Sequence, residues 1–89
     1  GMCGPGAGAQ LAVRGVTAMG GTLPVNPSGG ALSANPILVA GLARLIEASL
    51  QVRGEAGARQ VPGAGTALAQ GYHGPCGQSQ CVWIVSGKR

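Results

Sequence analysis

The chain has 89 residues and a net charge of +4, which comes from only six basic and two acidic residues. A chain of this length forms one small domain at most and buries about 60–65% of the surface of its unfolded state. Glycine supplies 18 residues and proline six, yet the apolar residues are clustered and make up 45% of the chain, which excludes disorder as its main state.

The basic residues are scattered and do not alternate with aromatic side chains, since the chain has one Trp, one Tyr and no Phe. Nucleic-acid binding surfaces concentrate positive charge or combine it with stacking aromatics, so we expect no nucleic-acid partner. The internal arginines, Glu47 and Glu55 are predicted to be solvated surface. The shortage of large side chains indicates that part of the core belongs to residues outside this chain.

Three cysteines, Cys3, Cys76 and Cys81, are an odd number without the spacing of a disulfide framework. The first residues show no basic segment followed by an apolar one, and no apolar run approaches the roughly 20 residues of a membrane span. We therefore expect reduced thiols, a cytoplasmic location and no membrane span. The first residues also read as the middle of a domain.

The N-terminal third contains three expected elements. The segment "AQLAVRGV" predicts a short helix that ends near Gly15, and "GGTLPVN" predicts an extended segment that its proline confines to a sheet edge or a short strand. The next stretch, "NPSGG", predicts a turn. Gly29 and Gly30 allow backbone conformations and close approaches there that a Cβ would block.

A long helix is the strongest prediction. Asn35 is a favourable N-cap, Pro36 suits the first helical position, and Gly54 is a typical end. The apolar positions that follow the start are Ile37, Leu38, Val39, Leu42, Leu45, Ile46, Leu50 and Val52. They surround a narrow polar stripe of Arg44, Glu47 and Gln51. Because only this stripe needs solvent, the pattern predicts a largely buried helix.

Residues 55–64 are expected to form a loop, and "TALAQ" and "CVWIV" are candidate strands joined by the glycine-rich "GYHGPCGQSQ". The second strand is apolar without alternation, as is typical of a strand covered on both faces. A buried helix and such a strand need layers on both sides, which indicates part of a layered α/β domain. We expect the isolated chain to be marginally stable or prone to aggregation.

The order of "GMCGPGAGAQLAVRGVTAMGGTLPVNPSGGALS", a proline-started helix and "QVRGEAGARQVPGA" resembles the C-terminal portion of the thiolase family. It is most similar to the branch linked to lipid-transfer proteins and acyl-CoA degradation. The resemblance implies a fold of two βαβαβαββ halves, with residues 1–89 as a partial C-terminal domain at the end of the second half. It also implies acyl-CoA thioester substrates without a further cofactor, a homodimer, and a missing N-terminal half.

The resemblance implies an active site, and this sequence departs from the family's pattern there at two positions. The family's acyl-carrying cysteine lies in the first half, outside this chain, and its Gly-His-Pro motif aligns with Ala34, Asn35 and Pro36. Asn35 can donate a hydrogen bond to a thioester oxygen but cannot titrate near neutral pH, and it can equally be only a helix cap. Leu38 replaces a family glycine, which predicts a narrower or reshaped pocket.

The family's second catalytic cysteine corresponds to His73 in one alignment of the glycine-rich turn and to Cys76 in another. His73 is a candidate base by its usual pKa, and Cys76 is a candidate acid–base thiol, but each can also be a bystander. Gly29, Gly30 and the backbone N–H of Gln78 are the candidate substrate-binding groups. Two alternatives are weaker: Tyr72 as an acid, and a zinc site of His73, Cys76 and Cys81, which lacks the usual ligand spacing. Cys81 is expected to point into the core.

Three functions remain open at this stage. The chain is part of an acyl-CoA acyltransferase that needs its N-terminal half, or part of an acyl-CoA lyase or lipid-binding subunit that works with a small partner subunit. The third is a remnant without catalysis. A nucleophilic cysteine upstream favours the first, and its absence favours the second.

Overall fold

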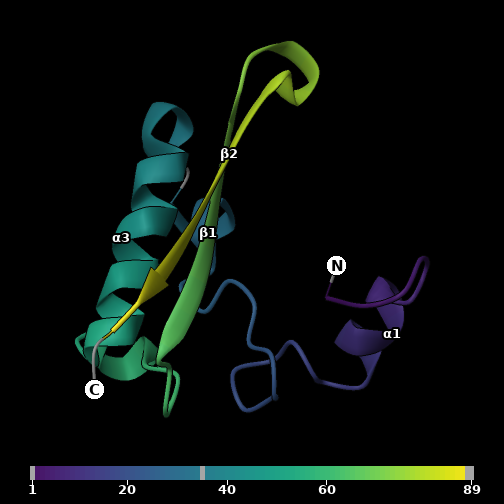
Figure 1. The fold of residues 1–89 in the computed structure, drawn as a ribbon, viewed down its shortest axis with the longest axis vertical. Helices are drawn as coiled ribbons and strands as arrows, with labels where there is room; N and C mark the ends of the chain where they lie inside the picture. The colour runs from purple at the N-terminus through teal and green to yellow at the C-terminus, as the bar shows by residue number, and fades with distance from the viewer. Residues whose placement is uncertain (1, 35, 88–89) are drawn as a thin grey trace.

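The computed structural model describes residues 2–34 and 36–87, which form a mixed α/β arrangement with one long helix beside a hairpin (Figure 1). The elements are α1 (Gly8–Val13), α2 (Gly30–Ala34), α3 (Ala40–Arg53), β1 (Thr66–His73) and β2 (Ser79–Ser86). Single 3₁₀ turns occupy Ile37–Val39, Gly57–Arg59 and Pro75–Gly77. The predicted class, one long helix plus short strands in an α/β fold, is confirmed.

The start of the long helix differs from the prediction, whereas its end agrees. The N–H of Val39 bonds to the carbonyl of Pro36 at 2.7 Å in a 3₁₀ turn, so α3 begins at Ala40 and not at Pro36. Asn35, the expected N-cap, lies outside the described residues. At the other end Gly54 has φ 75°, and the N–H of Glu55 bonds to the carbonyl of Leu50 at 2.9 Å. This left-handed glycine ends the helix as predicted.

The two strands form an antiparallel hairpin that pairs Ala69 with Trp83 and Gly71 with Cys81. Both strands extend beyond the predicted segments, so the connection shrinks to residues 74–78. A Cβ on Gly41 of α3 would lie 3.3 Å from the Cα of Gly71, which shows how closely α3 approaches β1 at these two glycines. Small residues therefore bring the helix onto one face of the hairpin.

The opposite face of the hairpin has no cover among the described residues. Paired residues of an antiparallel sheet share a face, so Leu68, Val82 and Ile84 lie on the face opposite Ala69. Their exposed fractions are 50%, 56% and 74%. On the α3 side, Cys81 and Trp83 of β2 are exposed as well. The expectation that the second strand is covered on both faces is therefore not met within this chain.

The N-terminal segment lies apart from α3 and the hairpin (Figure 1). The predicted short helix is confirmed as α1, which buries no residue. The prediction that residues 20–26 form a sheet edge or a short strand is wrong, because no strand is present there. The backbone bonds donated there are local: Gly21 donates to Ala18 at 2.9 Å, and Leu23 and Val25 donate to Val16 and Thr17 at 3.0 Å each. Pro24 has no N–H to donate.

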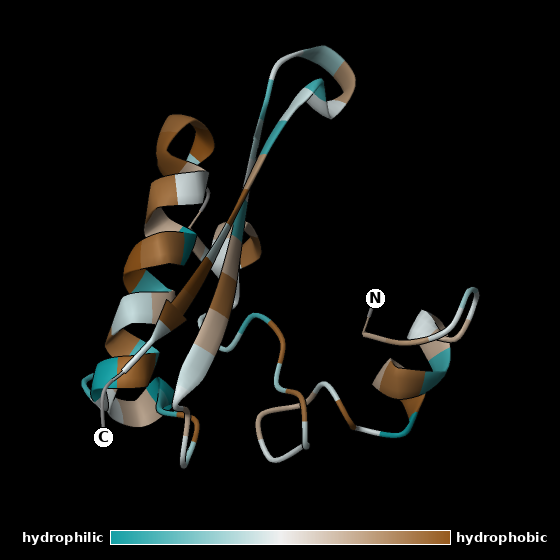
Figure 2. Cartoon of the chain, in the orientation of Figure 1, coloured by the Kyte–Doolittle hydropathy of each residue, from teal (hydrophilic) through white to brown (hydrophobic). Residues whose placement is uncertain are grey.

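The orientation of α3 corrects the expected solvent stripe. Gln51 is only 4% exposed and the Glu47 side chain 13%, whereas the apolar Leu42 and Ile46 are 57% and 52% exposed. Figure 2 shows hydrophobic residues along α3 and the middle of both strands, with a mostly pale or hydrophilic turn. Within this chain α3 is covered on its hairpin side and on its polar flank. Its expected burial on all sides is not reached.

Candidate functional site

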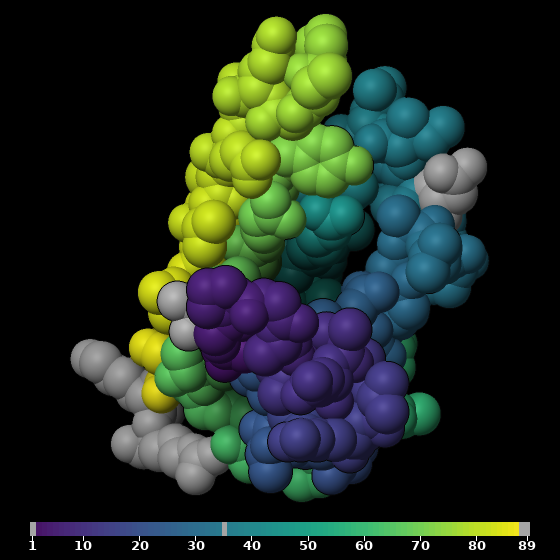
Figure 3. Space-filling view, turned by 90° about the vertical axis from the view of Figure 1, so that its right-hand side faces the viewer, coloured from purple at the N-terminus to yellow at the C-terminus, as the bar shows by residue number. Residues whose placement is uncertain are grey.

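A cleft of about 200 Å³ lies between α2 and the start of α3. It is lined by Ser28, Gly30, Ala31, Ser33, Ala34, Pro36, Ala40, Ala43, Arg44 and Glu47. The space-filling view shows a wider hollow between the hairpin and the segment that carries α2 (Figure 3), although no hairpin residue lines the cleft itself. Most of the lining is small and apolar, and the charged side chains come from α3. Such a lining suits an apolar group with a few polar contacts.

The "NPSGG" loop enters this cleft with a tightly constrained backbone. Gly29 and Gly30 have φ of 77° and 54°, and a Cβ on Gly30 would lie 2.5 Å from Oδ1 of Asn26. The N–H of Gly30 donates to Oγ of Ser28 at 3.2 Å. The conformation expected of these glycines is thus confirmed. Gly30 lines the cleft, and substrate binding by Gly29 and Gly30 stays a prediction.

The hairpin turn holds the other predicted site residues together. His73 ends β1, and Cys76 and Gln78 follow within the turn. Cys76 has φ 56°, a left-handed conformation that costs a residue other than glycine about 1–3 kcal/mol. Both His73 and Cys76 are exposed, so their groups are accessible, and their catalytic roles stay predictions. Cys81 is also exposed, which corrects the expectation that it points into the core.

Arg44 connects the cleft to the hairpin, although the sequence predicted it to be solvated surface. It lines the cleft, and its Nη1 donates to the backbone carbonyl of Gln70 at 2.9 Å. Its Cζ lies 5.8 Å from the centroid of the Tyr72 ring. The regular spacing of the polar stripe on α3 could have indicated these contacts, because a polar stripe on one side of a helix can face other polar groups as well as water. Leu38, expected to reshape the pocket, is 96% exposed and is not part of the cleft lining.

Glu47 lies beside Arg44 in the cleft lining and is paired with Arg59 at 3.0 Å. Burial by itself raises the pKa of the Glu47 carboxyl, but hydrogen bonds from Arg59 and Gln51 and the charge of Arg59 outweigh it and lower that pKa below its ordinary 4.5. The same pairing raises the pKa of Arg59. Glu47 is therefore a charged anchor for the loop that follows α3, and not a proton donor near neutral pH.

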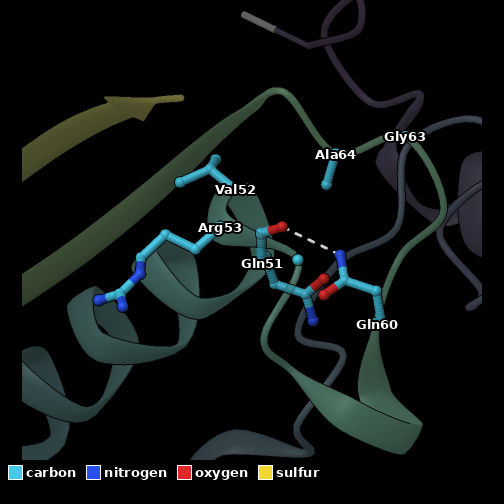
Figure 4. A pocket seen from close by; sticks show the side chains of 7 residues that line it. Gln51, Val52, Arg53, Gln60, Gly63 and Ala64 are labelled. Carbon is cyan, nitrogen blue, oxygen red and sulfur yellow. Dashed lines mark hydrogen bonds between the residues drawn. The ribbon is translucent and has the colours of Figure 1, made fainter. Parts of the chain in front are cut away.

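A second depression of about 290 Å³ lies at the C-terminal end of α3 (Figure 4). Gln51 and Gln60 line it, and Nε2 of Gln60 donates to the carbonyl of Gln51 at 2.9 Å. The Gln51 side chain accepts from the N–H of Val61 at 2.8 Å and donates to the carbonyl of Arg59 at 2.7 Å. These amides satisfy one another and fix the loop, so this depression is structural.

The described residues contain neither a metal-binding cluster nor a membrane-spanning helix. In residues 2–34 and 36–87, no three His, Cys, Asp or Glu side chains are close enough to hold a metal ion, and the three thiols are free. No helix in the described part of the chain is long and apolar enough to cross a membrane.

Comparison with known proteins gives a consistent family. Residues 1–87 match the family described as thiolase C-terminal domain-like. Human sterol carrier protein 2 is 51% identical over 69 residues, which are 76% of this chain and 13% of the human protein. An acetyl-CoA acetyltransferase of Methanothermobacter thermautotrophicus is 39% identical over 82 residues, 91% of this chain and 21% of that protein.

A third relative, the non-specific lipid-transfer protein-like 2 of Caenorhabditis elegans, is 41% identical over 76% of this chain and 17% of its own length. The chain thus spans between about an eighth and a fifth of these curated relatives. No solved structure matches it significantly. Since the family match covers nearly every residue, this chain belongs to the thiolase C-terminal domain-like family.

Proposed function

We propose that this chain is the C-terminal part of a thiolase-like acyl-CoA acyltransferase that works in lipid and acyl-CoA metabolism. The observation that carries the proposal is the family match over residues 1–87. The relative named acetyl-CoA acetyltransferase supports the acyl transfer, and the relatives named for sterol carriage and lipid transfer support the lipid context. In this proposal the protein is a cytoplasmic homodimer, and an N-terminal half supplies the acyl-carrying cysteine.

The role proposed for this chain is to bind the thioester and to move a proton. The cleft beside Gly30 is proposed to receive the acyl-CoA thioester, with the backbone of Gly29, Gly30 and Gln78 around it. The accessible turn carries His73 and Cys76, one of which transfers the proton when the C–C bond is made or cleaved. The left-handed backbone of Cys76 supports a functional turn, because such strain is concentrated at functional sites. Without the N-terminal half, the chain is proposed to be inactive.

The test is substitution in the longest polypeptide that the gene encodes, with acyl-CoA turnover measured against pH. We expect His73→Ala to lower kcat by about 10²–10⁴-fold and to remove its dependence on pH near neutrality if His73 is the base. Cys76→Ser has this effect instead if the alternative alignment holds. Cys3→Ser, at another exposed thiol, is the matched control. Full rates and unchanged pH profiles in both turn variants would overturn the catalytic role.

A second function is favoured by one observation, the Asn35 that stands where the resembled motif has histidine. Without that histidine, the protein is an acyl-CoA lyase or a lipid-binding subunit that works with a small partner subunit. The sequence upstream of this chain distinguishes the two functions, because an acyltransferase requires a nucleophilic cysteine there. A gene that encodes only these 89 residues would leave the third possibility, a remnant without catalysis.

A further inference from the structure

Arg44 is half-buried at the cleft and contacts the hairpin at two points. Its Nη1 donates to the carbonyl of Gln70 at 2.9 Å, and its guanidinium lies over the ring of Tyr72. A planar guanidinium can donate in its plane while its face rests on an aromatic ring. The two anchored residues are alternate positions of β1, and His73 follows directly. Arg44 thus contacts the strand end that leads into the turn through both a hydrogen bond and a ring.

The charge of Arg44 is not used in an ion pair. In the described ranges the ion pairs join Arg53 to Glu55 and Arg59 to Glu47, and no carboxylate pairs with Arg44. Glu47, one turn away on α3, is already held by Arg59. Arg44 therefore directs its side-chain hydrogen bond to the hairpin, whereas the exposed Arg53 donates to Glu55.

The turn beyond Arg44 has no other hydrogen-bonded anchor to α2 or α3. In residues 2–34 and 36–87, the hydrogen bonds of residues 73–78 stay within the hairpin, as between Gly77 and Gly74 at 3.1 Å. Nε2 of Gln70 donates to Oε1 of Gln80 across the strands at 2.7 Å. This bond lies within the hairpin and does not connect the hairpin to α2 or α3. Figure 1 shows the turn extending away from the main body. The placement of the turn relative to the cleft thus depends on the contacts at its base.

We propose that Arg44 is a positioning residue that fixes how the turn carrying His73 and Cys76 is placed relative to the cleft lined by Gly30. This inference rests on the proposed function, because it assumes that the turn supplies a reacting group. Arg44 acts through the hairpin and takes no proton itself. Loss of Arg44 leaves the cleft able to bind substrate but misplaces the reacting group, so it lowers kcat more than it changes KM.

The first arm of the test measures turnover by the longest polypeptide that the gene encodes. We expect Arg44→Met to lower kcat about 10- to 100-fold, as small misplacements can, with KM changed by less than about twofold. Arg44→Lys restores part of the loss, since an ammonium retains the charge over the Tyr72 ring. Arg53→Met, which removes an exposed arginine from the same helix, is the matched control. A purely structural Arg44 instead lowers the melting temperature and leaves kcat of the folded protein unchanged.

The second arm needs no turnover and separates this inference from the proposed function. Amide hydrogen exchange of residues 71–73 is expected to become about tenfold faster in Arg44→Met and to stay at the parent rate in Arg53→Met. If the parent shows no turnover, the proposed function fails and the exchange result alone decides the positioning role. If Arg44→Met does not fold, Tyr72→Leu takes its place, because it removes the ring contact and leaves α3 intact. Equal exchange and equal kcat in the Arg44 and Arg53 variants would overturn the inference.

Discussion

The two flanks of α3 have opposite chemistry and opposite exposure. The polar flank of Arg44, Glu47 and Gln51 is covered by its own chain, and each of these side chains has a specific partner there. The apolar flank of Leu42 and Ile46 is more than half exposed. Polarity alone therefore does not decide which side of this helix is covered. The polar flank is covered because β1 and the loop after α3 offer carbonyls, an N–H group and a guanidinium. The bare apolar flank agrees with the expectation that α3 lies between layers.

The largest expected effect comes from making the apolar flank polar. We expect Leu42→Gln with Ile46→Gln to lower the free energy of unfolding of the longest gene product by about 4 kcal/mol, if a further layer packs on this flank. In the 89-residue chain alone the same pair changes stability by less than about 0.5 kcal/mol, because both side chains are already exposed. Chemical denaturation of both proteins measures the difference.

Val13→Gln on α1 is the control for this comparison, since Val13 is 88% exposed. Equal and small effects of the Leu42 and Ile46 changes in both proteins would contradict the layered arrangement.

The polar flank is expected to show the second largest effect. Gln51→Leu removes the partner of the Val61 N–H and of the Arg59 carbonyl at a site that is 4% exposed. Each buried polar group left without a partner costs about 1–3 kcal/mol, so we expect a loss of about 3 kcal/mol in the free energy of unfolding. Gln10→Leu on the exposed α1 is the control. A Gln51→Leu variant as stable as the Gln10 variant would show that this network contributes nothing.

The fold could be predicted where local chemistry decides it. Gly54 ends the helix because a left-handed residue is needed there, and the apolar 81–85 segment forms a strand with 66–70 as its partner. The start of α3 could not be predicted, since Pro36 is compatible both with an α-helix and with the 3₁₀ turn that is present. The short helix α2 was also missed, as its five residues carry no periodic pattern.

The site could be predicted in part for a similar reason. The two glycines of "NPSGG" predicted a backbone conformation that other residues rarely adopt, and Gly29 and Gly30 do have positive φ. Arg44 and Gln51 could not be placed, because a helical stripe shows which residues share a flank but not which segment covers that flank. Their partners, Gln70 and Val61, are separated from them in sequence and are brought close only by the fold.

The contact between α3 and β1 predicts an intermediate effect. Gly71→Val is expected to lower the free energy of unfolding by about 2 kcal/mol, since a Cβ there would lie 3.4 Å from the Cα of Gly41 and 3.5 Å from the Trp83 ring, and the extra methyls have no space. Gly20→Val is the control, because nothing lies within 4 Å of a Cβ at Gly20. Thermal or chemical denaturation measures both. Similar losses of stability in the two variants would show that the close approach of Gly41 and Gly71 does not restrict the size of the side chain at position 71.

The smallest expected effect is the pH dependence of the polar flank. Because the folded-state pKa of Glu47 is below its ordinary 4.5, the pairing with Arg59 stabilises the fold above that pH, and the contribution is lost as pH falls through the folded-state value. Glu47→Gln keeps an oxygen for Gln51 but removes the charge facing Arg59, so we expect a loss of up to about 1 kcal/mol at pH 7, as for a partly exposed ion pair. The difference between parent and variant should shrink below pH 4.5. Denaturation of both proteins between neutral and acidic pH measures it, with Glu55→Gln in the exposed Arg53 pair as the control for the lost charge. A difference that stays constant to the lowest pH would mean that the charge of Glu47 does not stabilise this flank, and the polar flank of α3 would then be held by its neutral hydrogen bonds.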